Sequence, residues 1–124
     1  MSKRIHVAVA VIENAHGEIL LTQRASDKHQ GGLWEFPGGK CETDEAITAA
    51  LIREIREELA IEITAATPLI SIPYTYPDLH VLLDVFRVTA FNGQPLGAEG
   101  QPMQWVPPSQ LSSIPLPAAN RPIV

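Results

Sequence analysis

Hydrophobic positions in the first third of the chain form short runs separated by turn residues. "RIHVAVAVIE" and "ILLTQRAS" are rich in valine, isoleucine and leucine, which predicts two β-strands. "NAHGE" lies between them and supplies turn residues, so the two strands are expected to form a hairpin. "DKHQGG" follows as a polar loop, and "LWEFPGGK" is a short extended piece interrupted by Pro37 and two glycines.

The period of the pattern changes at Thr43. Apolar residues then recur at every fourth position: Ile47, Leu51, Ile55 and Leu59. This spacing predicts an amphipathic helix, and no glycine or proline interrupts it from Asp44 to Leu59. Thr43 is the expected N-cap, with Asp44 and Glu45 in the first turn, where carboxylates favour the helix dipole.

The last half of the chain returns to β-type runs. "TPLISIPYTYP", "LHVLLDVFRVTAF" and "QPMQWVP" predict three strands, and "PSQLSSI" predicts a short helix opened by Pro108 or Ser109. The expected architecture is one domain over residues 1–124, with two helices on a mixed sheet in the order ββ(loop)αβββα. The ending "PLPAANRPIV" admits a last helix that is cut off, in which case the natural chain is longer.

Composition narrows the class of protein. The chain has 124 residues, of which 45% are apolar and 19% charged, as in a folded protein with one core. A net charge of -5 argues against binding a nucleic-acid backbone, but a carboxylate site can still hold phosphates through metal ions. Cys41 is the single cysteine and cannot form an internal disulfide, and no run of 18 apolar residues predicts a membrane span. The expected location is cytoplasmic.

Three glutamates crowd one side of the predicted helix. At about 100° per residue, Glu54, Glu57 and Glu58 fall within a sector about 100° wide. Glu58 lies in azimuth between Ile47 and Leu51, so at least one carboxylate is directed to the rim of the core. Carboxylates this close repel one another, and partial burial makes each ionised form costlier.

Arginines or divalent cations could balance this charge. Arg53 and Glu57 are spaced i,i+4, but such a pair contributes only about 0.5 kcal/mol or less. Mg²⁺ prefers oxygen ligands, and a carboxylate cluster is its usual setting. The alternative is an ordinary solvated helix face, which is what most charge runs are.

A glycine loop precedes the helix. In "FPGGK", two glycines allow the backbone to approach a ligand closely, and Lys40 places a cation where an anionic substrate can be met. From Gly39 to Ile61 the sequence resembles the Nudix box, G-x5-E-x7-R-E-U-x-E-E-x-G-U with U apolar. Eight of its nine fixed positions match: Gly39, Glu45, Arg53, Glu54, Ile55, Glu57, Glu58 and Ile61. Ala60 replaces the box glycine and is expected to be tolerated if its φ stays negative.

Further stretches, "RASDKHQGGLWEFPGGK", "YPDLH", "GAEGQPMQW" and "PAANRPIV", resemble the MutT subfamily of Nudix hydrolases. The resemblance implies an α/β/α sandwich with a mixed β-sheet. It also implies removal of pyrophosphate from nucleoside triphosphates with a preference for 8-oxo-dGTP, which serves mutation avoidance. The implied Mg²⁺ ligands, with Mn²⁺ as a substitute, are the Gly38 carbonyl, Glu54, Glu57, Glu58 and Glu99.

The same resemblance implies roles around the substrate. Either Glu54 or Glu99 is the general base, and Arg53 orients the catalytic glutamate. Lys40 and Arg24 meet phosphate oxygens.

The implied base pocket has two further parts. Phe36 walls it or stacks on the base. Asn120 reads the oxidised guanine, because an amide offers both a donor and an acceptor; its alternative is a helix N-cap. Leu79 stands where the reference enzyme of the family carries arginine, which matters if the guanidinium rather than the backbone amide is used.

Two other functions stay open. The same chemistry could act on CTP or on a nucleotide sugar such as ADP-ribose, or the domain could be a sensor that binds a nucleotide without hydrolysing it. A sensor is disfavoured because such modules usually lose box carboxylates. The expected partner is a small nucleotide, with no nucleic-acid polymer and no membrane, and a monomer is favoured.

Overall fold

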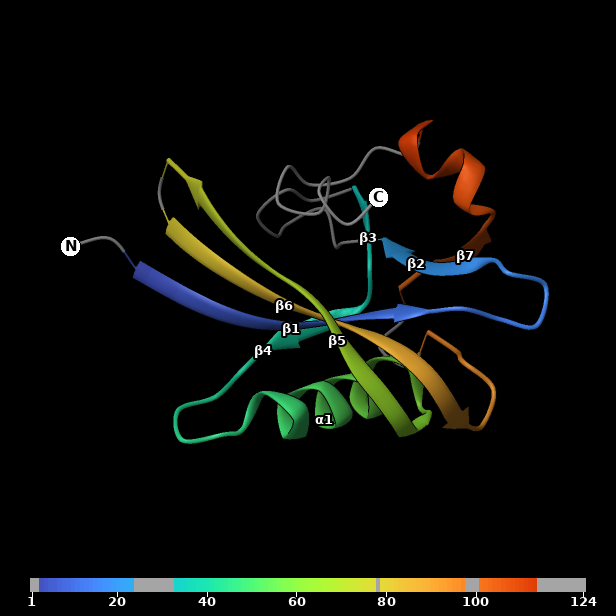
Figure 1. The fold of residues 1–124 in the computed structure, drawn as a ribbon, viewed down its shortest axis with the longest axis horizontal. Coiled ribbons are helices and arrows are strands. Elements are labelled where there is room, and N and C mark those ends of the chain that lie inside the picture. The colour runs from blue at the N-terminus through green and yellow to red at the C-terminus, as the bar shows by residue number, and fades with distance from the viewer. Residues whose placement is uncertain (1–2, 24–32, 78, 98–100, 114–124) are drawn as a thin grey trace.

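The strands divide between two sheets in the computed structural model, which describes residues 3–23, 33–77, 79–97 and 101–113. The elements in chain order are β1 (Lys3–Ile12), β2 (Ile19–Gln23), β3 (Trp34–Glu35), β4 (Gly38–Lys40), α1 (Ile47–Leu59), β5 (Glu62–Tyr76), β6 (Leu79–Asn92), β7 (Met103–Val106) and a 3₁₀ helix (Pro108–Ser113). One sheet has the order β4-β1-β6-β5 and the other β3-β2-β7. Figure 1 shows α1 below the four-stranded sheet, with β2 and β7 above it at the right.

The four-stranded sheet is mixed, as expected. β1 runs parallel to β6, with Val7 opposite Leu83, and antiparallel to β4, with Ala8 opposite Gly39. β5 and β6 form a long antiparallel pair. A central strand that is covered on both faces should be apolar throughout, which explains the near-continuous valine and alanine run of β1.

The prediction of a β1–β2 hairpin is confirmed only at the turn and is wrong for the pairing of the two strands. Asn14 and Gly17 close the turn, with Gly17 at φ +77°, but a single bridge between Glu13 and Ile19 is all that follows. Both edges of β1 are occupied by β4 and β6, because the glycine segment returns to it. β2 therefore pairs with β3 and β7 instead.

Two core clusters lie on opposite faces of β1. Ala8, Ala10 and Ile12 pack with α1, whose buried stripe is Leu51, Ile55 and Leu59. Val9 packs on the other side with a cluster that includes Leu21, Phe36 and Leu83. β2 contributes to both clusters, because Leu20 joins the α1 cluster and its neighbours Ile19 and Leu21 join the other.

The helix begins later than the sequence predicts. Its N-cap is Ala46 with no side-chain cap, so Thr43 is not the cap, and no acidic residue lies in the first turn. Residues 42–45 form a separate turn in which the Glu45 N–H donates to the Glu42 carbonyl and Asp44 adopts φ 65°. In this arrangement the Glu45 carboxylate accepts from Arg53 and from the Glu42 N–H, and it does not cap the helix.

Ala60 ends the helix in the left-handed conformation, with φ 58° and ψ 32°. The expectation of a negative φ is wrong. The Ala60 N–H still donates to the Arg56 carbonyl, a hydrogen bond that ends the helix in the way a glycine normally does. The alanine side chain is therefore tolerated at a conformational cost of about 1–2 kcal/mol.

The short helix expected near Pro108 is present as the 3₁₀ helix over Pro108–Ser113. The last helix expected from "PLPAANRPIV" falls within 114–124, outside the described residues. Within the described ranges, no helix combines the length and the apolar character needed to cross a bilayer.

We predict that Ala60→Gly stabilises the protein by about 1 kcal/mol, since glycine adopts positive φ without the steric penalty that alanine has. Urea unfolding of both proteins measures the difference. Ala49, exposed within α1, gives the matched control: Ala49→Gly should destabilise by about 0.5–1 kcal/mol. Equal effects of the two substitutions would contradict the strain at Ala60.

Candidate active site

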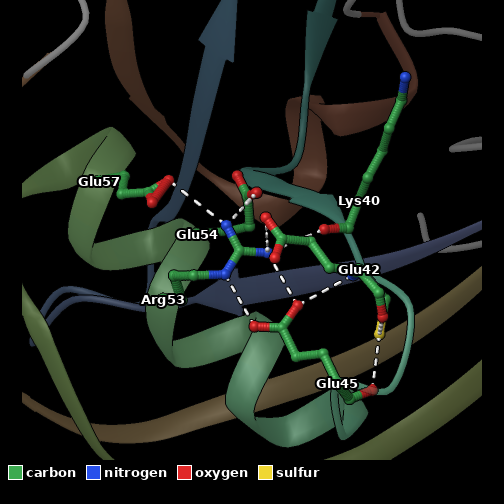
Figure 2. Close-up of polar contacts among 7 residues, drawn as sticks. Lys40, Glu42, Glu45, Arg53, Glu54 and Glu57 are labelled. Carbon is green, nitrogen blue, oxygen red and sulfur yellow. Dashed lines mark hydrogen bonds and ion pairs between the residues drawn. The ribbon is translucent and has the colours of Figure 1, made fainter.

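The Arg53 guanidinium is the centre of a cluster of carboxylates (Figure 2). Its Nε and Nη2 donate to both oxygens of Glu45 at 2.8 and 2.9 Å, and Nη1 donates to Glu54 at 2.8 Å. Glu57 lies 3.4 Å from the same Nη1, and Glu42 lies 4.0 Å from Nη2. One cation therefore contacts four carboxylates, which leaves the cluster strongly negative.

Hydrogen bonds within this cluster shift the pKa values of Glu45 and Arg53. The Arg53 side chain lowers the pKa of Glu45 to about 2, with the Glu42 N–H contributing in the same direction. The hydrogen bond to Glu45 in turn raises the pKa of Arg53 above its ordinary value, with Glu54 adding to the effect. Both groups therefore remain charged throughout the physiological range.

Glu58 behaves differently from the other box glutamates. It is 9% exposed, as its position on the helical wheel predicts. Its Oε1 accepts the Thr22 hydroxyl at 3.1 Å, and its Oε2 accepts the Gly38 N–H at 3.3 Å. The carboxylate thus connects α1 to β2 and β4.

The two glycines of the loop are needed for different contacts. A Cβ on Gly38 would lie 2.0 Å from the Ala8 carbonyl oxygen of the neighbouring strand. A Cβ on Gly39 would lie 2.1 Å from a carboxylate oxygen of Glu54. The two glycines thus allow close contacts with β1 and with the Glu54 side chain, and the approach to a ligand stays a prediction.

Three of the residues predicted to contact the substrate lie within the described ranges: Lys40, Phe36 and Leu79. Lys40 is exposed; its carbonyl accepts from Arg53 Nη2 at 3.1 Å, while its side chain extends away from the guanidinium (Figure 2). Phe36 is 3% exposed in the core cluster on the face of β1 opposite α1, and Leu79 packs against the same cluster. The two proposed pocket residues therefore share one side of the sheet.

Arg24, Glu99 and Asn120 lie outside the described residues. The segments that flank Glu99 are tied to the end of α1. The Leu96 N–H donates to the Leu59 carbonyl at 3.0 Å, and Gln101 Nε2 donates to the Glu58 carbonyl at 2.8 Å. The connection between β6 and β7 is thereby anchored to the helix that carries the glutamates.

The described glutamates fit a divalent metal by their chemistry. Glu54, Glu57 and Glu58 supply hard oxygen donors from one helix, beside the backbone of Gly38. Within the described ranges, however, no three His, Cys, Asp or Glu side chains are grouped as a metal site, since Glu54 and Glu57 turn to Arg53 and Glu58 to Thr22.

Two polar contacts of the site escaped the sequence reasoning. Thr22 is 1% exposed and donates to Glu58, and Gln101 donates to the backbone of the same residue. A signal for Thr22 exists in the sequence: it is a polar residue at the end of the apolar run "ILLT". No comparable pattern points to Gln101.

Comparison with known proteins agrees with this fold and identifies the family. The family described as NUDIX domain matches residues 8–124, so the chain belongs to that family. A MutT structure, described for Aliivibrio salmonicida and Vibrio cholerae, superposes with a TM-score of 0.85 at 40% identity, covering 98% of this chain and 94% of that one. The protein is a MutT-type Nudix hydrolase with a mixed α/β fold, as the box indicates.

Two relatives from Escherichia coli strain K12 carry different names. One, named 8-oxo-dGTP diphosphatase, is 37% identical over 122 residues, which cover 98% of this chain and 95% of that protein. The other, named CTP pyrophosphohydrolase, is 39% identical over 122 residues, with 98% and 90% covered. Members of the family generally depend on a divalent metal.

We predict that Glu45→Gln removes part of the acid dependence of stability. The folded-state pKa of Glu45, about 2, lies below its ordinary 4.5, so its contribution is complete above pH 4.5 and is lost as the pH falls toward 2. Urea unfolding across that range should show a shallower loss of unfolding free energy for the variant. Parallel curves for the two proteins would contradict the Arg53–Glu45 assignment.

We also predict a contrast between the two glycines. Gly38→Ala forces a Cβ against the β1 backbone and should destabilise by about 3 kcal/mol or more, measured by urea unfolding. Gly39→Ala meets the end of a flexible side chain and should stay folded, while displacement of Glu54 lowers hydrolase activity by about 100-fold. Equal stability losses in the two variants would contradict this reading.

Proposed function

We propose that this protein hydrolyses 8-oxo-dGTP to 8-oxo-dGMP and pyrophosphate in the presence of Mg²⁺. The observation that carries the proposal is the Arg53-centred cluster, in which the catalytic glutamate Glu54 is held by a guanidinium and lies against Gly39. The relatives named 8-oxo-dGTP diphosphatase support the choice of substrate.

The metal would be held by Glu54, Glu57, Glu58 and the Gly38 carbonyl, with Glu99 as a further ligand. When bound, a divalent cation supplies neutralisation of phosphate charge and a lower pKa for coordinated water. Mg²⁺ is the expected ion because the donors are all oxygen, and Mn²⁺ should substitute for it.

The residues of the chain have separate tasks in the reaction. Arg53 holds Glu54 in one orientation through the 2.8 Å hydrogen bond. Glu54 accepts a proton from the attacking water, whose oxygen forms a new bond to phosphorus. The P–O bond between the α and β phosphoryl groups breaks, its electron pair stays on the departing oxygen, and 8-oxo-dGMP and pyrophosphate separate. Glu99 is the alternative base. The ammonium of Lys40, which extends from β4, and the guanidinium of Arg24 would meet phosphate oxygens.

Recognition of the base is assigned to a separate group of residues. Phe36 would wall the pocket, Leu79 would line it, and Asn120 would read the oxidised purine edge with its donor and acceptor. With leucine at position 79, contact there would come from the backbone amide.

A second candidate substrate is CTP, because the relative named CTP pyrophosphohydrolase is as similar to this chain as the 8-oxo-dGTP diphosphatases are. The two substrates differ in base size and in their hydrogen-bonding edges, while the triphosphate is shared. The choice between them therefore depends on the base pocket alone.

Pyrophosphate release with Mg²⁺ tests the proposal, comparing 8-oxo-dGTP with dGTP, CTP and ADP-ribose. We expect preference for 8-oxo-dGTP, and Glu57→Gln should lower kcat by about 100-fold or more through loss of a metal ligand. Asn120→Ala should reduce the preference for the oxidised base. A preference for CTP would contradict the assigned base pocket but leave the hydrolytic site standing. Nucleotide binding without turnover would contradict the proposed hydrolase activity.

A further inference from the structure

The hydroxyl of Thr22 is a buried polar group within an apolar strand. Ile19, Leu20 and Leu21 precede it in β2 and are all buried, and Thr22 itself is 1% exposed. Valine has almost the same shape and would fill this position by packing alone. A buried hydroxyl is costly unless it is hydrogen-bonded, so its presence calls for a partner.

The alternation of side chains along β2 determines which partner the Thr22 hydroxyl can reach. Side chains alternate along a strand, so Thr22 lies on the same side of β2 as Leu20, which packs in the cluster formed with α1. On that side the Thr22 hydroxyl donates to Glu58 Oε1 at 3.1 Å, across 36 positions of sequence. The hydrogen bond therefore joins β2 to α1 at Glu58.

Glu58 needs such donors because its carboxylate is nearly removed from water. It is 9% exposed, and an ionised carboxylate at that depth is stabilised by hydrogen bonds to its oxygens. Thr22 donates to one oxygen, and the Gly38 N–H donates to the other at 3.3 Å. A carboxylate offers about four acceptor positions, so these two bonds, one to each oxygen, use part of that capacity.

We propose that Thr22 is a positioning residue for Glu58. Its hydroxyl fixes the orientation in which the Glu58 carboxylate meets a divalent cation, while packing of the threonine methyl is secondary. The inference rests on the proposed function, because Glu58 is one of the metal ligands assigned there. Outer hydrogen bonds of this kind typically change metal affinity or activity by about 10- to 100-fold when removed.

Isosteric substitution separates positioning from packing. Thr22→Val keeps the shape and loses the hydroxyl, whereas Thr22→Ser keeps the hydroxyl and loses the methyl. Positioning predicts that Thr22→Val binds Mn²⁺ about 10- to 100-fold more weakly and that Thr22→Ser stays within a few-fold of wild type. Packing predicts the reverse order, with the valine variant the more stable and the more active.

Two measurements on the full chain make the test. Mn²⁺ binding is measured by titration calorimetry without nucleotide, and pyrophosphate release gives kcat and KM at saturating Mg²⁺. The expected result is weaker Mn²⁺ binding and lower kcat for Thr22→Val, with the Ser variant restored. Thr67, exposed on β5, provides the control: Thr67→Val should leave both quantities unchanged.

Each outcome decides the inference. Wild-type affinity and kcat in a folded Thr22→Val protein would overturn it while leaving the proposed function standing. If the valine variant does not fold, Thr22→Ala and Thr22→Ser form the next pair, and an Ala variant equal to the Ser variant would overturn the inference. A wild-type chain that neither binds Mn²⁺ nor releases pyrophosphate would overturn the proposed function and this inference with it.

Discussion

The Arg53 guanidinium joins three parts of the chain that the backbone alone would not hold together. It reaches β4 through the Lys40 carbonyl, the turn before α1 through Glu45, and the helix surface through Glu54 and Glu57. A planar fork with five N–H donors can make these bonds at once, whereas an ammonium group cannot match their geometry. This side chain is bonded to both the glycine loop and the helix, and the Glu58–Gly38 hydrogen bond is a second link between them.

The carboxylates of the site lie at different depths and have different hydrogen-bond donors. Glu45 and Glu54 lie near the surface and are paired with a cation, so part of their stabilisation is exposed to solvent screening. Glu58 lies deeper, and its carboxylate oxygens accept from the Thr22 hydroxyl and the Gly38 N–H. Pairing with Arg53 and hydrogen bonds from Thr22 and Gly38 thus both help to hold glutamates of the box on one side of the helix.

Backbone conformation accounts for the one departure from the box. Ala60 adopts the left-handed conformation that a glycine would occupy, so the fold is preserved and the cost is local strain. The charged positions of the box are all retained. The substitution therefore affects the exit of the helix rather than the carboxylates, which lie on the helix before it.

The amino-acid sequence by itself determined the elements and the chemistry of this protein, because both depend on local periodicity and on fixed spacing. The strands, the helix stripe, the inward azimuth of Glu58 and the Nudix box were all readable from it. Tertiary structure decided what depends on distant partners: β2 pairs in a second sheet instead of with β1, and Glu45 lies outside the helix and pairs with Arg53. It also decided that Thr22 meets Glu58 across 36 positions, since no local pattern encodes which side chain will face a buried carboxylate.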